Sequence, residues 1–201
     1  MAKDEETIAV YDAKVKDYSK AFAAAESDAS LERFTAQLPK GAKVLDWGCG
    51  PGTHAAAMHA RGFDVTATDA STAMVNQARS HPGVTVHQAT FSQLQDNDTY
   101  DGIWANFSLL HEPRSKMVEN LGRIARALKA GGVLHIGLKT GTGEARDHLG
   151  RFYTFYTSEE LRRLLTGAGF EVFNEVTGRD AGLAGTVDPW VEMLARLKSK
   201  G

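Results

Sequence analysis

The chain has 201 residues, 42% of them hydrophobic and 24% charged, a length that suits one folded domain with a small appendage. A formal net charge of −2 does not provide the overall positive charge typical of nucleic-acid-binding proteins, and the single Cys49 has no partner for an internal disulfide. Because the sequence shows neither a signal peptide nor the roughly 20 consecutive apolar residues of a membrane span, we expect a cytoplasmic protein that binds neither membranes nor nucleic acid.

The N-terminal segment predicts one or two helices. Its apolar residues recur at helical spacing and form one stripe, made of Tyr11, Val15, Tyr18 and Phe22. We therefore expect residues 1–30 to form an N-terminal helical cap and residues 31–201 to form the main domain. The cap either closes over a ligand as a lid or simply packs against the domain, and the stripe is compatible with both.

From residue 43 onward, short β-branched runs alternate with helical patterns, which is typical of an α/β fold. Strands are predicted over 43–47, 64–69, 84–87 and 100–105, with helices over 53–61, 71–80 and 113–128. Ser71 is placed to cap the second of these helices, and Gly131-Gly132 should end the third. The apolar run over 133–138 predicts a central strand that is covered on both faces.

The last fifty residues predict one helix and at least one strand. A capped helix is expected over 158–169, a strand over 170–176 and a loop over 177–185. Residues 189–198 fit either a strand or a helix, because their pattern does not decide between the two.

The most informative segment runs from Val44 to Gly52 and reads V-L-D-W-G-C-G-P-G. An apolar strand here opens through alternating glycines into a helix, and glycine lets a ligand approach the backbone closely because it has no Cβ. In an open parallel sheet, ligands bind beyond the carboxyl ends of the strands, which is where this loop must lie.

The spacing of this loop does not fit a dinucleotide site. Such a site needs a small residue three positions after the second glycine, where this chain has Thr53. Asp46 would repel a pyrophosphate but suits an ammonium group, and Asp69, nineteen residues after Gly50, suits ribose hydroxyls. These residues predict a ribose-bearing ligand with a cationic amino-acid end.

With these motifs, from about Tyr11 to its end, the sequence resembles the class I S-adenosylmethionine-dependent methyltransferases, in their small single-domain bacterial form. Four features carry the resemblance: the D-x-G-x-G-x-G loop at 46–52, the strand-ending Asp69, the segment 100–111, and the L-K-A-G-G turn at 128–132. The resemblance implies a Rossmann-like, doubly wound sheet of seven strands with a reversed last strand. It therefore favours a strand over 189–198.

The resemblance also implies S-adenosylmethionine as cofactor, S-adenosylhomocysteine as product, and a set of cofactor-binding residues. Asp46 and the glycine loop would bind the methionine end, and Asp69 the ribose. Many relatives place an acid before an aromatic residue near the adenine, whereas here Thr90 precedes Phe91, so that a hydroxyl or a backbone carbonyl would accept instead. The full set is Tyr11, Tyr18, Asp46, Gly48, Cys49, Gly50, Gly52, Asp69, Ala70, Met74, Thr90, Phe91, Ala105 and Asn106.

We expect an enzyme that transfers a methyl group to a small-molecule acceptor by in-line displacement, in which the cofactor carries the reactivity. His111 is the candidate general base, or else a structural histidine bonded to a loop carbonyl. Lys139 and the run 151–156 should border the acceptor pocket, although aromatic residues of that run are equally suited to the core.

Histidine spacing predicts no metal site. The alternative functions are a methyltransferase for RNA or protein and a non-catalytic module that binds S-adenosylmethionine. The sequence leaves open a monomer or a homodimer.

Overall fold

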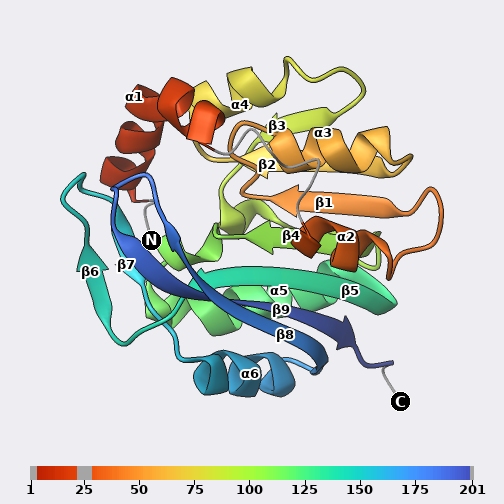
Figure 1. The fold of residues 1–201 in the computed structure, drawn as a ribbon. Coiled ribbons are helices and arrows are strands. Elements are labelled where there is room, and N and C mark those ends of the chain that lie inside the picture. The colour runs from red at the N-terminus through yellow and green to blue at the C-terminus, as the bar shows by residue number, and fades with distance from the viewer. Residues whose placement is uncertain (1–3, 22–28, 200–201) are drawn as a thin grey trace.

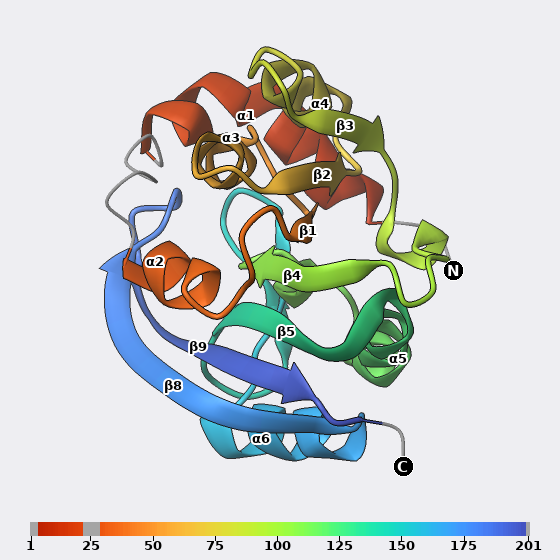
Figure 2. The ribbon, with the colours of Figure 1, turned by 90° about the vertical axis from the view of Figure 1, so that its right-hand side faces the viewer.

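The fold is built on one seven-stranded sheet with the strand order β3-β2-β1-β4-β5-β9-β8 (Figure 1). The computed structural model describes residues 4–21 and 29–199. The strands of the sheet are β1 (Lys43–Trp47), β2 (Asp64–Asp69), β3 (Thr85–Gln88), β4 (Tyr100–Asn106), β5 (Leu128–Lys139), β8 (Phe170–Ala181) and β9 (Val187–Leu197). Strands β1 to β5 pair in parallel, whereas β9 is antiparallel to both β5 and β8. The predicted seven-stranded sheet with a reversed last strand is therefore confirmed, and Figure 2 shows its twist from β3 at one edge to β8 at the other.

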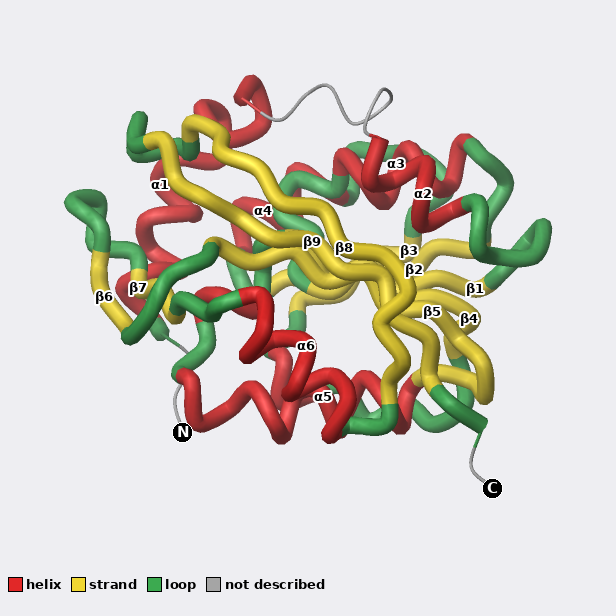
Figure 3. The backbone as a smooth tube through the Cα atoms, turned by 60° about the horizontal axis from the view of Figure 1, so that its bottom comes forward, coloured by secondary structure: helices red, strands yellow, loops and turns green. Residues whose placement is uncertain are grey.

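Helices cover both faces of the sheet, as the doubly wound prediction requires (Figure 3). The helices are α1 (Glu5–Ala21), α2 (Ala29–Thr35), α3 (Thr53–Ala60), α4 (Thr72–Ala78), α5 (Met117–Ala127) and α6 (Ser158–Gly167). Buried residues of α2, α3 and α4, such as Phe34 and Met58, pack with Val44 on one face. On the other face, α5 and α6 contribute Leu121 and Leu165 to a second core. No helix of the described residues is long and apolar enough to cross a membrane.

Two predictions about the start of β5 are wrong: the strand begins before residue 133, and Gly131 and Gly132 do not end the preceding helix. The helix expected over 113–128 begins with the 3-10 turn η4 (Arg114–Lys116) and ends at Ala127, before the two glycines. Gly131 and Gly132 instead lie within β5, at an irregularity where Tyr100 pairs with Leu128 but Gly102 pairs with Val133. Gly131 has a φ of 76°, which lets the chain bulge out and still continue as a strand.

The loop predicted over 177–185 is mostly strand. Residues Thr177–Ala181 continue β8 by pairing with Val187–Val191 of β9, a long-range contact that local sequence does not reveal. The cap of α6 is Thr157, whose side chain accepts a hydrogen bond from the backbone N–H of Glu160. Sequence patterns also missed the short hairpin of β6 (Glu144–Arg146) and β7 (Phe152–Thr154).

The N-terminal segment forms α1, with a kink at Lys14, and α1 lies across the carboxyl ends of the parallel strands (Figure 1). Tyr11 and Tyr18 of the predicted stripe pack edge to face with ring centroids 5.6 Å apart. Phe22 lies outside the described residues, as does part of the boundary region between the predicted cap and the main domain.

Gly52 is a position where the fold requires glycine. Its φ is +82°, and a Cβ there would lie 2.8 Å from the Cβ of Ala78, so α3 and α4 could not pack as they do. We expect Gly52→Ala to lower the free energy of unfolding by about 2–5 kcal/mol, the sum of backbone strain and overpacking. Urea unfolding measures this change.

Gly62 supplies the control, because its φ of +89° is similar but a Cβ there would meet open space. Gly62→Ala should lose only about 1–2 kcal/mol, for backbone strain alone. Equal losses in the two variants would show that the close approach at Gly52 has no energetic consequence.

Candidate functional site

Two adjoining cavities lie where β1, β2, β4 and β5 end, beneath α1. The smaller has a volume of about 110 Å³ and the larger about 470 Å³. Asp69 ends β2, Asn106 ends β4 and Lys139 ends β5, so parallel strands bring residues distant in sequence to one edge. The residues that line both cavities are Tyr11, Tyr18, Gly48, Gly50, Asn106, Phe107 and His111.

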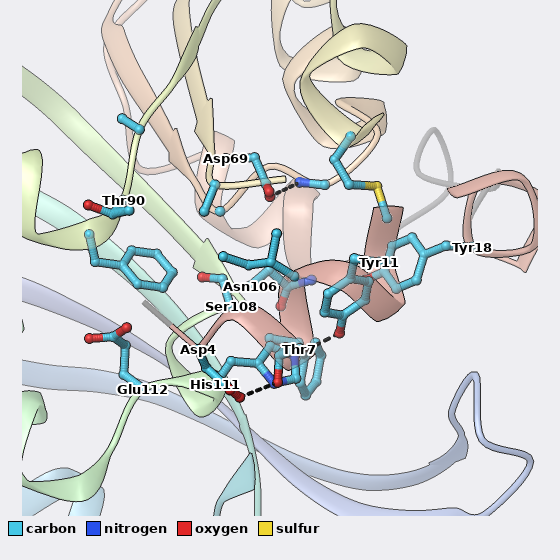
Figure 4. A pocket seen from close by; sticks show the side chains of 18 residues that line it. Asp4, Thr7, Tyr11, Tyr18, Asp69, Thr90, Asn106, Ser108, His111 and Glu112 are labelled. Atoms are coloured by element: carbon cyan, nitrogen blue, oxygen red, sulfur yellow. Dashed lines mark hydrogen bonds between the residues drawn. The ribbon is translucent and has the colours of Figure 1, made fainter. Parts of the chain in front are cut away.

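The glycine loop after β1 is held by the end of β2. The N–H groups of Gly48 and Cys49 donate to the carbonyl of Thr68 at 2.8 and 2.9 Å, and the N–H of Gly50 donates to Asp69 Oδ2 at 2.9 Å (Figure 4). A Cβ on Gly48 would lie 2.3 Å from the Cβ of Ser108, so only glycine fits at this crossing. Contacts within the protein therefore fix the shape of this loop.

Asp69 also reaches the start of α4. Its Oδ1 accepts a hydrogen bond from the N–H of Ser71 at 2.8 Å, and burial raises the pKa of its carboxyl. The N-cap of α4 is Ser71, as the sequence predicts, because Ser71 Oγ accepts from the N–H of Met74 at 3.1 Å. Asp69 thus joins two backbone segments of the site, and its oxygens retain lone pairs for further donors.

Asp46 is buried in the wall of the larger cavity. Its Oδ2 has no hydrogen-bond partner among the described residues. Burial, reinforced by the negative charge of Asp69, raises the pKa of Asp46 to about 7. An ammonium group would supply the missing donor and the missing positive charge, so this residue fits the amino-acid end of S-adenosylmethionine.

The predicted adenine side forms the smaller cavity, lined by Ala70, Met74, Thr90 and Phe91. The Thr90 hydroxyl lies 3.0 Å from both Gln93 Oε1 and the Ser92 hydroxyl, so part of its hydrogen-bonding capacity is already used. In Figure 4, Thr90 lies across the pocket from Tyr11 and Tyr18. This arrangement is compatible with a nucleobase between them.

Three other predicted cofactor residues do not line the smaller cavity. Cys49 lines only the larger cavity, and burial raises the pKa of its thiol, which disfavours the reactive thiolate. Gly52 and Ala105 line neither cavity, because Gly52 packs against Ala78 and Ala105 is fully buried in the core. Among the described residues, no group of three or more His, Cys, Asp or Glu side chains is arranged to hold a metal ion.

His111 is held on both ring nitrogens. Nδ1 lies 2.6 Å from the carbonyl oxygen of Phe152, which can only accept, so Nδ1 carries the proton. Nε2 then accepts a hydrogen bond from the Tyr11 hydroxyl at 2.7 Å (Figure 4). Burial and the nearby cations Arg151 and Lys139 lower the pKa of His111 to about 4, so the imidazole is neutral at physiological pH. The bond expected of a structural histidine is therefore present, and the role as base stays a prediction.

Sequence reasoning missed much of the lining. Ser108, whose Oγ donates to the carbonyl of Trp47 at 2.7 Å, lines the smaller cavity. Trp190, Glu192 and the segment 180–183 line the larger one, together with the expected Lys139 and Tyr153. The β8–β9 hairpin enters the site only through long-range strand pairing, so no local motif could have identified its residues.

The comparisons with known proteins agree with this geometry. A family model described as a methyltransferase domain matches residues 44–132. A malonyl-[acyl-carrier protein] O-methyltransferase of Salmonella typhimurium is 31% identical over 97 residues, which are 46% of this chain and 37% of that protein. The matching region is therefore little more than a third of the length of this curated relative.

Two crystal structures cover more of the chain. The first is the 1,6-didemethyltoxoflavin-N1-methyltransferase of Burkholderia thailandensis, solved with bound 1,6-didemethyltoxoflavin and S-adenosylhomocysteine. Its sequence is 25% identical to this chain, and the TM-score is 0.76. It covers 99% of this chain and 92% of its own. The second, an S-adenosylmethionine-dependent methyltransferase from Methanosarcina mazei, is 20% identical with a TM-score of 0.74. It covers 83% of this chain and 97% of its own.

The fold and the glycine loop thus define a Rossmann-like α/β domain of the methyltransferase type. The chain is therefore similar to the class I S-adenosylmethionine-dependent methyltransferases, and residues 44–132 match a methyltransferase domain.

The raised pKa of Asp46 predicts pH-dependent cofactor binding. Near pH 7 the free carboxyl is about half protonated, whereas a bound ammonium favours the ionised form, so binding should release protons. The affinity for S-adenosylhomocysteine should rise several-fold between about pH 6 and about pH 7.5, by at most about tenfold per pH unit. Calorimetry in buffers of different ionisation enthalpy measures both effects.

Asp46→Asn is the matched variant, because it keeps the shape of the side chain and removes its titration. It should bind S-adenosylhomocysteine more weakly and lose most of this pH dependence. An affinity of the unchanged protein that is flat over this range would contradict the assignment of Asp46.

Proposed function

We propose that the protein is a cytoplasmic enzyme that transfers the methyl group of S-adenosylmethionine to a small-molecule acceptor. The observation that supports this most strongly is the larger cavity, about 470 Å³, which adjoins the candidate cofactor site and shares its central residues. Such a volume suits a small ligand. The protein from Burkholderia thailandensis, which aligns over nearly the whole chain, has 1,6-didemethyltoxoflavin bound in its crystal structure.

The proposed mechanism rests mainly on binding and orientation. The bound cofactor would supply a methyl group activated by the positive sulfur. Asp46 would hold its ammonium and Asp69 its ribose, while Asn106, at the border of the two cavities, would lie near the reacting end. Holding an acceptor in line with the methyl group can by itself lower the barrier by roughly 7–11 kcal/mol.

His111 is proposed as the group that receives a proton from the acceptor, directly or through the Tyr11 hydroxyl. Its neutral Nε2 lies at the border of the two cavities, 2.7 Å from that hydroxyl. Because its pKa is low, it suits an acceptor whose proton becomes acidic once the methyl group is attached.

The direct test is a screen of small molecules with the purified protein and S-adenosylmethionine, in which release of S-adenosylhomocysteine is measured. We expect at least one small molecule to give turnover that exceeds any release with RNA or protein substrates. Turnover only with a macromolecule would contradict the acceptor class. Binding of S-adenosylmethionine without turnover on any of the three substrate classes would instead favour a non-catalytic module.

We also propose that α1 acts as a lid. It contributes Ile8, Tyr11 and Tyr18 to the cavity walls, but its anchors are largely polar. Asp12 Oδ1 accepts from Ser71 Oγ at 2.5 Å and from the N–H of Ala73 at 3.0 Å, and Asp4 pairs with Arg146 at 2.9 Å. Partly exposed ion pairs stabilise a fold by only about 0–1 kcal/mol each, so the free energy needed to open α1 should be small.

The lid predicts that ligand slows hydrogen exchange in α1. Addition of S-adenosylhomocysteine should increase protection of the described α1 amides, because the bound ligand would fill the space beneath Tyr11 and Tyr18. Helix α5, packed on the far face of the sheet, is the internal control and should change little. Equal protection of the α1 amides with and without ligand would contradict the lid and show that α1 is a fixed part of the fold.

A further inference from the structure

One part of the wall of the larger cavity holds three hydrogen-bond donors that are not fully used, those of Arg151, Lys139 and Tyr153. Arg151 donates through Nε and Nη2 to Asp147 Oδ2 at 2.9 and 2.7 Å, whereas its Nη1 has only a long contact, 3.4 Å, to the Tyr11 hydroxyl. Lys139 Nζ donates to Asp188 Oδ2 at 2.6 Å, which leaves N–H groups for another acceptor.

The third donor is the Tyr153 hydroxyl, with which no other described residue forms a hydrogen bond. Burial raises the pKa of Tyr153, so the hydroxyl keeps its proton. Both cations flank this ring, with Lys139 Nζ 4.3 Å and the Arg151 guanidinium carbon 5.3 Å from its centroid. The three side chains therefore form one cluster on the wall.

Apart from Asp46, each carboxylate in this cavity wall already accepts at least one hydrogen bond. Asp188 accepts from Lys139 and from Thr186, Asp180 accepts from Trp190 Nε1 at 2.7 Å, and Glu192 accepts from Ser30 and Arg33. Lys139, Arg151 and Tyr153 therefore keep N–H and O–H groups that these carboxylates do not use. A group with several acceptor oxygens and a negative charge fits these donors best.

We propose that Arg151, Lys139 and Tyr153 bind a carboxylate carried by the methyl acceptor, which is therefore a small aromatic acid. The aromatic part is argued from the rings between the cofactor side and the cluster: Tyr11 and His111 have centroids 5.3 Å apart and planes at 72°, and His111 and Tyr153 have centroids 4.7 Å apart and planes at 58°. Rings inclined in this way suit edge-to-face contacts with an aromatic ligand. This inference rests on the proposed function, because it assumes that an acceptor occupies the larger cavity.

The test compares two probes of similar shape, 4-hydroxybenzoate and its neutral counterpart 4-hydroxybenzamide, on the protein loaded with S-adenosylhomocysteine. Ligand-observed NMR gives both dissociation constants. The acid should bind at least about tenfold more tightly than the amide, because each charge-assisted hydrogen bond to it is worth that much or more.

Two variants should reduce this preference to less than about threefold: Lys139→Met, which keeps the stem, and Tyr153→Phe, which removes only the hydroxyl. Lys129→Met is the matched control, since Lys129 lies near the other end of β5 and pairs with Asp101 at 2.8 Å, away from the cavity. It should retain the full preference. Calorimetry with S-adenosylhomocysteine should give unchanged cofactor affinity in all three variants.

Equal binding of acid and amide, no binding of either probe, or an unchanged preference in both subsite variants would overturn the carboxylate subsite. If S-adenosylhomocysteine itself fails to bind the unchanged protein, the proposed function fails instead, so the two failures are distinguishable.

Discussion

The site depends on one half-buried carboxylate that connects separate segments of the backbone. Asp69, at the end of β2, accepts hydrogen bonds from the N–H of Gly50 in the glycine loop and from the N–H of Ser71 at the start of α4. The loop itself sits where only glycine fits, against Ser108 from the segment after β4. The ends of the neighbouring strands β2, β1 and β4 are thereby fixed relative to one another by contacts within the protein.

The remaining walls of the site are held in part by more exposed contacts. Helix α1 contacts α4 through Asp12, and Asp4, just before α1, contacts the β6–β7 hairpin; both contacts are polar. The larger cavity is completed by the β8–β9 hairpin, whose tip contributes residues 180–183. We interpret this division as a rigid cofactor half and an adaptable acceptor half, which is how one fold can serve many acceptors.

The grouping of the candidate cofactor residues at one edge of the sheet could be predicted from sequence because these residues are local, while their roles stay predictions. Asp46, the glycine loop and Asp69 lie within one β-α-β unit, where spacing along the chain fixes their position in space. The structure adds that Asp69 is not free in the cleft but bonded to two backbone N–H groups. We therefore expect its loss to destabilise the protein as well, a cost that a hydrated carboxylate would not carry.

The acceptor half could not be predicted in the same way. Its wall combines Lys139 at the end of β5 and Trp190 of β9, which pair in the seven-stranded sheet, with Tyr153 of β7, which belongs to the separate two-stranded sheet. These residues are distant in sequence, so no local pattern groups them. Patterns also misjudged the glycines within β5 and the length of β8, since both depend on pairing with distant residues.

The most direct test of this account is Asp69→Ala, measured by calorimetry with S-adenosylhomocysteine and by thermal unfolding. Asp101→Ala is the control, because Asp101 also accepts from a backbone N–H, that of Lys43 at 2.8 Å, but lines neither cavity. Both variants should melt at lower temperature, and only Asp69→Ala should lose affinity, by at least about 100-fold, since two charge-assisted hydrogen bonds to the ribose are removed. An Asp69→Ala protein that is destabilised but binds S-adenosylhomocysteine as tightly as the unchanged protein would contradict the account.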